Sequence, residues 1–273
     1  MRERVMKLKI KRGGIMKLTN YHTHHDRCKH AKGGVEDYVR EAVLQQYDEI
    51  GMSCHTPHRD FKQLGTRRMS YSELPDYFND IERAQKKYPQ IRILKALECE
   101  YFPNLYEDIK ALRAQTDYLI LAQHYIQIDG EFKDAFHFTQ PRQLELYASG
   151  IEEGMATGFF KILAHPDVFM TTYPKWDEAC EVATRKIAEA ALKYDVILEV
   201  NANGLRRGEQ TYEDGVRYPY PSEKFWSIIA TEFPTVKVMV NSDCHDPAYL
   251  NDAYMQMARD FAKRLNLNVM THL

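Results

Sequence analysis

The sequence lacks the cysteine patterns that mark disulfide-rich and zinc-ribbon proteins. Its 273 residues include five cysteines, and no two of them have C-x-x-C spacing: Cys28, Cys54, Cys99, Cys180 and Cys244. This scattered, odd-numbered set argues against a disulfide framework. Free thiols are typical of a reducing cytoplasm. We therefore expect a cytoplasmic protein in which the cysteines are small buried residues that pack beneath other groups.

Long hydrophobic runs are also absent. The longest apolar segments have the length of a β-strand and no secretory signal is evident, so we expect no transmembrane helix. The net charge is only −2 at pH 7, which gives no global attraction to nucleic acid or to an anionic membrane. We therefore expect neither of them as a partner, and the composition leaves the oligomeric state open.

Residues 1–15 form a strongly basic segment, with six Lys or Arg against one Glu. A nucleic-acid or membrane role is one interpretation, but the segment is short and no aromatic residue interleaves the basic ones. The alternative is a start-site artefact, because Met16 is a natural N-terminus that leads directly into the first expected strand. We prefer the artefact. No linker rich in Pro, Gly or Ser divides the rest, so we expect one domain over residues 16–273.

Strand-like and helix-like segments alternate throughout this domain. The sequence predicts strands at 16–22, 50–54, 91–97, 118–123, 160–164, 196–201 and 236–241. It predicts helices at 35–46, 72–88, 105–113, 141–155, 176–194, 222–233 and 248–265. Strands that are each followed by a helix indicate a parallel sheet with helices outside it. A closed or nearly closed barrel is the simplest arrangement, and an open doubly wound sheet is the alternative.

Candidate metal ligands favour the barrel. A His, Glu or Asp lies at the carboxyl end of six different expected strands: His22, His55, Glu98, His124, His165 and Asp243. A barrel brings these ends onto one ring, at the face where barrel enzymes have their active sites. An open sheet would hold its outer strand ends too far apart to share one cluster. We therefore expect an α/β barrel with a metal site at the C-terminal ends of its strands.

Two spacings strengthen the metal hypothesis. His22 and His24 are two residues apart, as are Asp243 and His245, so each pair points to one side of an extended strand. Imidazole combined with carboxylate suits zinc, manganese or iron. The seven histidines and two acidic residues near the strand ends are too many for one ion. Three divalent transition-metal ions that share a carboxylate would use all of them.

The order of the motifs resembles the PHP (polymerase and histidinol phosphatase) superfamily. The motifs are HxH at 22–24, GxxxHxP at 51–57, LExE at 97–100, QHY at 123–125, AHPD at 164–167 and NSDxH at 241–245. The likeness covers the chain from Met16 onward. CKH at 28–30 and NxxGLRRG at 201–208 are most similar to the histidinol-phosphate phosphatases of this superfamily. The resemblance implies a distorted (β/α)7 TIM-like barrel with a trinuclear metal centre.

The resemblance also implies a ligand set for each ion, carried over by position. The implied ligands are His22, His24, Glu98 and Asp243 for the first ion; Glu98, as a bridge, with His124 and His165 for the second; and His30, His55 and His245 for the third. Every one of these positions holds the expected type of residue. The identity of the metal stays open among zinc, manganese and iron.

Other polar residues near the strand ends have less certain roles. Arg206 and Arg207 follow the sixth strand, and we expect at least one of them to bind phosphate; an ordinary solvated pair is the alternative. Glu100 or Asp246 could orient a ligand imidazole. The remaining histidines at the rim, His25 and His58, could contact the substrate or only close the rim.

These observations predict a metal-dependent phosphomonoesterase acting on a small-molecule substrate. A hydroxide bridging two ions would attack phosphorus, with Asp243, Glu98, Arg206 and Arg207 as the catalytic residues. The resemblance implies L-histidinol phosphate as substrate, giving L-histidinol and phosphate in histidine biosynthesis. The alternative is a PHP-type phosphoesterase acting on another small phosphoester, a nucleotide or a nucleic-acid end. The near-neutral charge argues against nucleic acid.

Overall fold

A computed structural model describes residues 18–58 and 66–273. The basic segment at residues 1–15 lies outside the described residues. Seven parallel strands form one sheet in the order β1-β2-β3-β4-β7-β8-β11, and each corresponds to a predicted strand. The strands are β1 (Leu18–Asn20), β2 (Tyr47–Met52), β3 (Arg92–Cys99), β4 (Tyr118–Leu121), β7 (Ile162–Leu163), β8 (Ile197–Asn201) and β11 (Val238–Asn241).

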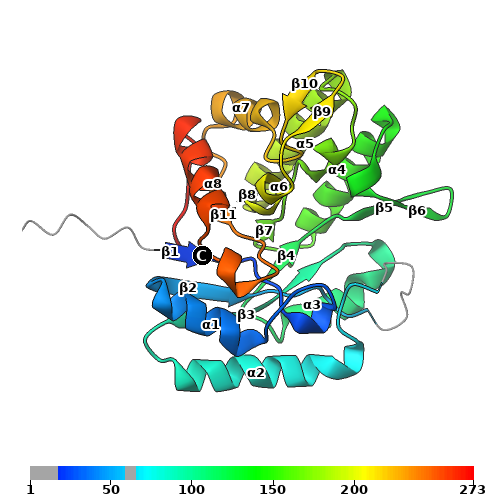
Figure 1. Ribbon diagram of the computed structural model, residues 1–273. Helices are drawn as coiled ribbons and strands as arrows, with labels where there is room; N and C mark the ends of the chain where they lie inside the picture. The colour runs from blue at the N-terminus through cyan, green and yellow to red at the C-terminus, as the bar shows by residue number, and fades with distance from the viewer. Residues whose placement is uncertain (1–17, 59–65) are drawn as a thin grey trace, which may run out of the picture.

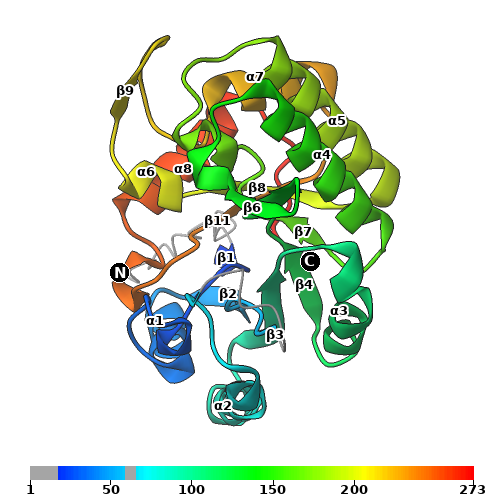
Figure 2. The same cartoon turned by 90° about the vertical axis from the view of Figure 1, so that its right-hand side faces the viewer.

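Helices surround the strands on the outside (Figure 2). The seven predicted helices are α1 (Val35–Leu44), α2 (Leu74–Lys87), α3 (Tyr106–Arg113), α4 (Pro141–Ala156), α5 (Glu178–Tyr194), α7 (Glu223–Glu232) and α8 (Ala253–Arg264). Local signals fix several of their starts: Asp177 accepts a hydrogen bond from the N–H of Cys180 at the start of α5, and Pro75 lies in the first turn of α2. No helix within the described ranges has the length and apolar composition needed to cross a membrane.

Two asparagines join the edge strands β1 and β11. The N–H of Tyr21 donates to Asn241 Oδ1 over 2.9 Å, and the N–H of Ser242 donates to Asn20 Oδ1 over 2.6 Å. An isolated parallel bridge joins the chain just beyond these residues. The two edges therefore meet, and the sheet curls into a nearly closed barrel (Figure 2). The predicted barrel is confirmed, and the open doubly wound sheet is excluded.

The interior of the barrel changes from apolar to polar along each strand. On β3, Leu94 and Ala96 face the same side as Glu98, because alternate residues of a strand share a face. The apolar part is a separate buried cluster consisting of Tyr21, Leu94, Ala96, Tyr118, Ile120, Ala122, Ile162, Ala164, Ile197 and Met239. This apolar plug fills the barrel below its carboxyl-end mouth, and the polar side chains at the mouth pack against it.

Several short elements lie in the loops between the main strands and helices. Two hairpins, β5 (Tyr125–Ile128) with β6 (Glu131–Asp134) and β9 (Gln210–Tyr212) with β10 (Gly215–Arg217), project from the barrel (Figures 1 and 2). Neither was predicted as a hairpin, although the β5–β6 turn is the dipeptide Asp129-Gly130, which is typical of tight hairpins. The other short elements are α6 (Asn203–Arg206), η1 (Asp26–Cys28), η3 (Tyr71–Glu73), η4 (Pro103–Leu105), η5 (Ala135–His137), η6 (Val168–Thr171) and η7 (Pro247–Tyr249).

Candidate metal centre

All nine predicted metal ligands converge at the carboxyl-end mouth of the barrel. His22 and His24 follow β1, His55 follows β2, Glu98 lies in β3, His124 follows β4, His165 follows β7, Asp243 and His245 follow β11, and His30 follows η1. Eight of them fall in overlapping groups whose donor atoms lie within 4.8 Å of one another, and His165 Nε2 lies 3.3 Å from Glu98 Oε1. The barrel therefore gathers onto one site the side chains that the sequence separates by more than 220 positions.

Glu98 lies at the middle of this cluster and is almost fully buried. Its Oε1 is 3.2 Å from His22 Nε2, 3.4 Å from His124 Nε2 and 3.3 Å from His165 Nε2. Its Oε2 is 2.7 Å from His55 Nδ1. Imidazole nitrogens thus face both oxygens of one carboxylate, which is the arrangement needed for a carboxylate that bridges two cations.

The HxH pair and Asp243 form a second focus beside Glu98. His24 Nε2 lies 3.2 Å from His22 Nε2 and 3.0 Å from Asp243 Oδ1. His22 Nε2 lies 3.7 Å from the same carboxylate oxygen. Both imidazoles of the pair therefore point to one side, as their spacing predicts, and meet the carboxylate from the other end of the chain.

His30 and His245 meet at the outer side of the cluster, with their Nε2 atoms 3.0 Å apart. The other ring nitrogen of each contacts a backbone carbonyl: His30 Nδ1 is 2.8 Å from the oxygen of Cys28, and His245 Nδ1 is 3.1 Å from that of Asp243. These contacts fix the rings so that Nε2 is the atom each presents to the site. His55 contacts both sides: its ring centroid lies 5.3 Å from that of His30, and its Nδ1 lies 2.7 Å from Glu98 Oε2.

Two carboxylate oxygens support the presence of cations at this site. Glu98 Oε2 and Asp243 Oδ1 are buried, and within the described part of the chain neither has a partner in hydrogen-bond geometry, although His55 Nδ1 lies 2.7 Å from the first and His24 Nε2 3.0 Å from the second. An unpaired buried carboxylate oxygen costs considerable free energy unless a cation or a donor meets it. Divalent ions among these oxygens and the imidazole nitrogens would satisfy both, so the donor set fits metal binding.

The histidines keep both carboxylates ionised. Burial alone would raise the pKa of Glu98, but His55, His22 and His124 outweigh it and hold the pKa well below its usual value. Burial likewise opposes ionisation of Asp243, yet His22 and His24 lower its pKa well below its usual value. A carboxylate that stays charged is a suitable metal ligand.

Two of the predicted ligands have strained backbones. His165 has φ of 29° and Asp243 has φ of 47°, in the left-handed region that non-glycine residues seldom adopt. Such strain persists only where the surrounding structure imposes it, and it occurs preferentially at functional sites. The backbone conformation therefore aims both side chains into the barrel mouth at a cost in stability.

Sequence reasoning missed Glu199, which lies within β8 and not past the end of the strand. Glu199 is fully buried, and its Oε1 lies 2.9 Å from His22 Nδ1, so it orients that imidazole. Its Oε2 accepts hydrogen bonds from the N–H of His165 over 3.1 Å and from Asn201 Nδ2 over 2.7 Å. Asn201 Nδ2 also donates to Asp243 Oδ2. The signal available in the sequence was a single charged residue within an otherwise apolar strand.

Glu100 has the orienting role that was considered for it. Its Oε1 lies 3.0 Å from His124 Nδ1, while Arg68 binds both of its oxygens over 3.0 and 3.1 Å. His58 Nε2 is 3.3 Å from its Oε2. The Arg68 guanidinium counters the effect of burial and helps to hold the pKa of Glu100 well below its usual value. Asp246 instead caps η7 by accepting the N–H of Ala248, and it pairs with Lys32 over 3.0 Å.

His25 and His58 hold the rim of the site together. His25 is fully buried, its Nδ1 accepts the backbone N–H of Arg27 over 3.2 Å, and its ring centroid lies 4.6 Å from that of Tyr77. His58 contacts Glu100, and its side chain is only 1 % exposed. Of the two roles left open for these histidines, closing the rim fits their contacts better than binding a substrate.

The two neighbouring arginines have different surroundings. Arg206 is tied down: its Nε and Nη2 bind Asp252 over 2.8 and 3.0 Å, and its Nη1 donates to the carbonyl of Ser242 over 2.6 Å. Arg207 is exposed, and its guanidinium carbon lies 4.8 Å from the ring centroid of Phe136 and 5.8 Å from that of Tyr220. Only Arg207 of the two therefore presents its guanidinium near the mouth.

The aromatic rings beside Arg207 also border the metal cluster. The centroid of the Phe136 ring lies 6.2 Å from that of His124, and the Tyr220 ring lies 6.2 Å from His165. The Phe136 ring therefore lies between Arg207 and His124, and the Tyr220 ring lies between Arg207 and His165 in this chain of contacts. Phe136 comes from η5, directly after the β5–β6 hairpin, so this segment contributes an apolar wall to the site.

Comparison with solved structures finds the same fold in proteins of low sequence identity. The structure of a candidate histidinol phosphatase from Listeria monocytogenes aligns with a TM-score of 0.70 and 21% identity, covering 88% of this chain and 99% of that chain. That of histidinol phosphate phosphatase from Lactococcus lactis, in complex with zinc, L-histidinol and phosphate, aligns with a TM-score of 0.68 and 19% identity. This second alignment covers 93% of this chain and 95% of that chain.

Comparison of sequences leads to the same group of proteins. A Schizosaccharomyces pombe protein named "Probable histidinol-phosphatase" is 23% identical over 258 residues, which covers 83% of this chain and 80% of the relative. The family model described as PHP domain matches residues 20–203, a span that holds β2 to β8 and seven of the nine predicted ligands. The match spans well over half of the sequence, and the chain therefore belongs to the PHP domain family.

Proposed function

We propose that this protein is a metal-dependent phosphomonoesterase that hydrolyses L-histidinol phosphate to L-histidinol and phosphate. The position of Glu98 is the observation that carries the proposal. One ionised, buried carboxylate has imidazole nitrogens within 3.4 Å of both its oxygens, at the face of the barrel where such enzymes have their active sites. Membership of the PHP domain family supports the same reading.

The proposed ligand sets are those that the resemblance implies, and one cluster of donor atoms, that of His22, His24 and Asp243, falls within the first set. We assign His22, His24, Glu98 and Asp243 to the first ion; Glu98, His124 and His165 to the second; and His30, His55 and His245 to the third. When bound, these ions would lower the pKa of a coordinated water and polarise the phosphoryl oxygens. Glu199 and Glu100 hold His22 and His124 in the orientation that binding requires.

Arg207 is the proposed phosphate-binding group of the chain. Its exposed guanidinium lies beside Phe136 and Tyr220, next to the proposed ligands of the second ion. A guanidinium stays charged at any working pH and binds two phosphate oxygens at once, so Arg207 can neutralise charge on the substrate phosphate. Arg206 would act through structure, by holding α6 against the segment after β11.

The names of the relatives support L-histidinol phosphate as the substrate. The Lactococcus lactis protein, named histidinol phosphate phosphatase, binds zinc, L-histidinol and phosphate in its solved complex. The Schizosaccharomyces pombe relative is named "Probable histidinol-phosphatase". The net charge of −2 disfavours a nucleic-acid substrate. Another small phosphoester would use the same metal centre and the same Arg207, so the choice between them requires a direct test.

A phosphate-release assay tests this proposal. The metal-reconstituted protein is given L-histidinol phosphate, nucleoside monophosphates, p-nitrophenyl phosphate and short DNA with 5′-phosphate ends. We expect the highest kcat/KM with L-histidinol phosphate and none with His22→Ala that remains folded by circular dichroism. Equal kcat/KM for generic phosphoesters would reduce the proposal to a PHP-type phosphoesterase. Release from none of the four would overturn it.

A further inference from the structure

Cys28 lies among the histidines of the third proposed ion. All five cysteines are buried and free, as the sequence predicts for packing residues. Cys28 differs from the other four because its sulfur and one ring nitrogen each of His30 and His245 all lie within 4.8 Å of one another. Ligands of a tetrahedral zinc ion lie roughly 3.5 Å apart, so these three atoms are close enough to share one ion.

The local backbone explains how Cys28 and His30 come to face the same point. The short helix η1 ends at Cys28, and Lys29 follows in the left-handed conformation with φ of 67°. This turn reverses the chain, so that His30 Nδ1 meets the carbonyl oxygen of Cys28 and the opposite ring nitrogen faces His245. Cys28 and His30 therefore flank the same space although they are two residues apart on a tight turn.

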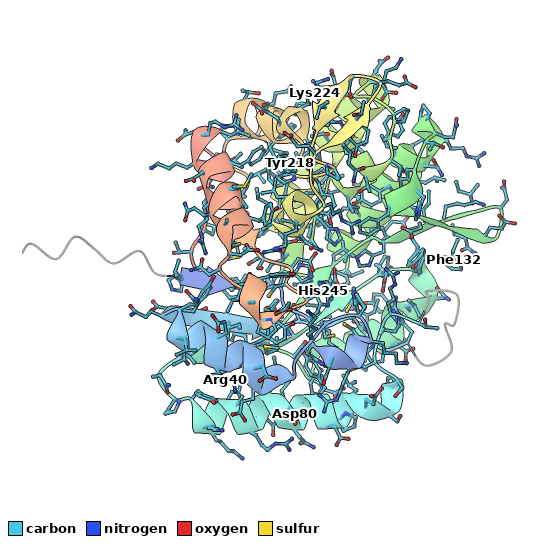
Figure 3. The ribbon with its side chains drawn as sticks, viewed as in Figure 1. Arg40, Asp80, Phe132, Tyr218, Lys224 and His245 are labelled. Carbon is cyan, nitrogen blue, oxygen red and sulfur yellow. The ribbon has the colours of Figure 1, made fainter. Side chains whose placement is uncertain are left out.

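The segment after β11 closes this space from the other side. The N–H of His24 donates to the carbonyl of Cys244 over 3.0 Å, and that of Lys32 donates to the carbonyl of His245 over 2.8 Å. These bonds hold His245 over the turn that carries Cys28. Figure 3 shows His245 near the middle of the molecule, where the segments from the two ends of the chain meet.

We propose that Cys28 is a thiolate ligand of the third ion, beside His30 and His245, and that it makes this position select zinc over manganese. The inference rests on the proposed metal centre and adds a ligand to it. On binding, the Cys28 thiol releases its proton to water and the sulfur forms the bond to the ion. The other two positions include Glu98 or Asp243, whereas this group contains only sulfur and imidazole nitrogen. Thiolate and imidazole suit zinc, and carboxylate suits manganese.

Cys54 is the neighbouring thiol, and its contacts make it the natural control. Its sulfur lies within 4.8 Å of the Cys28 sulfur and of a His24 nitrogen. Among the described residues, it does not belong to the group of donor atoms that Cys28 forms with His30 and His245. The Cys54 sulfur also lies 3.9 Å from the carbonyl oxygen of His25, to which its S–H can donate. Cys54 is therefore expected to pack behind Cys28 without binding the ion.

Cobalt(II) substitution tests the proposal, because it gives separate signals for metal binding and for a thiolate ligand. The apoprotein is loaded with cobalt, and its visible ligand-field bands report that the metal centre binds ions at all. A near-ultraviolet thiolate-to-cobalt charge-transfer band is expected in the wild type and in Cys54→Ser, and its loss is expected in Cys28→Ser. Dialysis should then show that Cys28→Ser holds its third zinc at least about 10-fold more weakly.

The outcomes separate the two proposals. Ligand-field bands without the charge-transfer band would overturn the Cys28 assignment and leave the metal centre standing. Absence of both signals would overturn the metal centre itself. A charge-transfer band that survives in Cys28→Ser would also overturn the assignment. X-ray absorption of the zinc-loaded wild type needs no variant: sulfur at about 2.3 Å from zinc is expected, and its absence would count against Cys28 even if Cys28→Ser fails to fold.

Discussion

At the scale of single residues, the adjacent Arg206 and Arg207 should have separable effects. Arg207→Ala removes a guanidinium beside the mouth, and a charge-assisted bond to phosphate contributes about 1.5–3 kcal/mol. We therefore expect kcat/KM to fall about 10- to 100-fold for every phosphomonoester, with little change in Tm. The measurement is steady-state kinetics on L-histidinol phosphate and p-nitrophenyl phosphate.

Arg206→Ala is the matched variant for this experiment. It removes the pair with Asp252 and the bond to the Ser242 carbonyl, so we expect a lower Tm and a smaller loss of kcat/KM. A loss of kcat/KM in Arg206→Ala that exceeds the loss in Arg207→Ala would reverse the proposed roles. Wild-type kcat/KM in both variants would show that neither arginine binds the phosphate of the substrate.

Glu100 offers a second test at this scale, since it touches a proposed ligand without touching an ion. Glu100→Gln weakens its contacts to His124 and Arg68, and loss of such an orienting partner lowers metal affinity about 10- to 100-fold. We expect one ion per chain to be lost on dialysis and activity to recover with added metal. Glu107→Gln, on the exposed side of α3, is the control and should retain all ions. Full metal retention by Glu100→Gln would contradict the orienting role.

At the scale of elements, the junction of β1 and β11 rests on side chains in place of a regular ladder. Asn241→Ala removes the acceptor of the buried Tyr21 N–H and one donor to Glu199. A buried group left unpaired costs about 1–3 kcal/mol, and each kcal/mol lowers Tm by about 2–4 °C in a chain of this size. Thermal unfolding should show this loss.

Asn20→Ala provides the reciprocal variant at the same junction, because Asn20 Oδ1 accepts the N–H of Ser242. It should lower Tm to a similar extent. Asn104→Ala, at an exposed position in η4, is the control and should leave Tm within about 1 °C of the wild type. If neither variant at the junction is less stable than this control, the asparagines do not hold the barrel closed.

At the scale of the whole molecule, metal ions should contribute to the stability of the fold. Each ion held at about 100 times its Kd adds about 2.7 kcal/mol, because it binds the folded chain and not the unfolded one. Chelation of three ions should therefore lower Tm by about 10 °C or more, and added zinc should restore it. Calorimetry with and without chelator makes this measurement.

Elemental analysis of the reconstituted protein accompanies that experiment. We expect close to three ions per chain, since nine ligand groups, eight of them buried or partly buried, converge at the mouth. At most one ion per chain after reconstitution would contradict a trinuclear centre. An unchanged Tm after complete metal removal would show that the apolar plug and the helices hold the barrel without help from the site.

Much of the fold and of the candidate site could be predicted from the sequence because the signals are local. The seven strands and seven main helices follow from hydrophobic periodicity, which short segments carry by themselves. The proposed ligands stand just past strand ends, and parallel strands bring those ends to one face. The HxH spacing of His22 and His24 predicts two imidazoles on one side, and the structure has them there.

The contacts of a side chain could not be read from its type. Glu199 is a lone charge in an apolar strand until the barrel sets it against His22, and Arg68 is 32 positions from the Glu100 that it binds. Arg206 and Arg207 are indistinguishable in sequence, yet one is tied to the segment after β11 and the other faces the mouth. Such pairings depend on which distant segments meet when the barrel closes.

The sequence by itself therefore determined the class of fold, the end of the barrel that carries the site and the chemistry of its donor groups, because period and spacing act over a few residues. Only the tertiary structure decided which atoms share a point in space. The bond between Asn20 and the N–H of Ser242 spans 222 positions, and it helps to close the ring on which Glu98, His22 and Asp243 meet. Contacts of that range carry no local pattern, since closure of the whole barrel creates them.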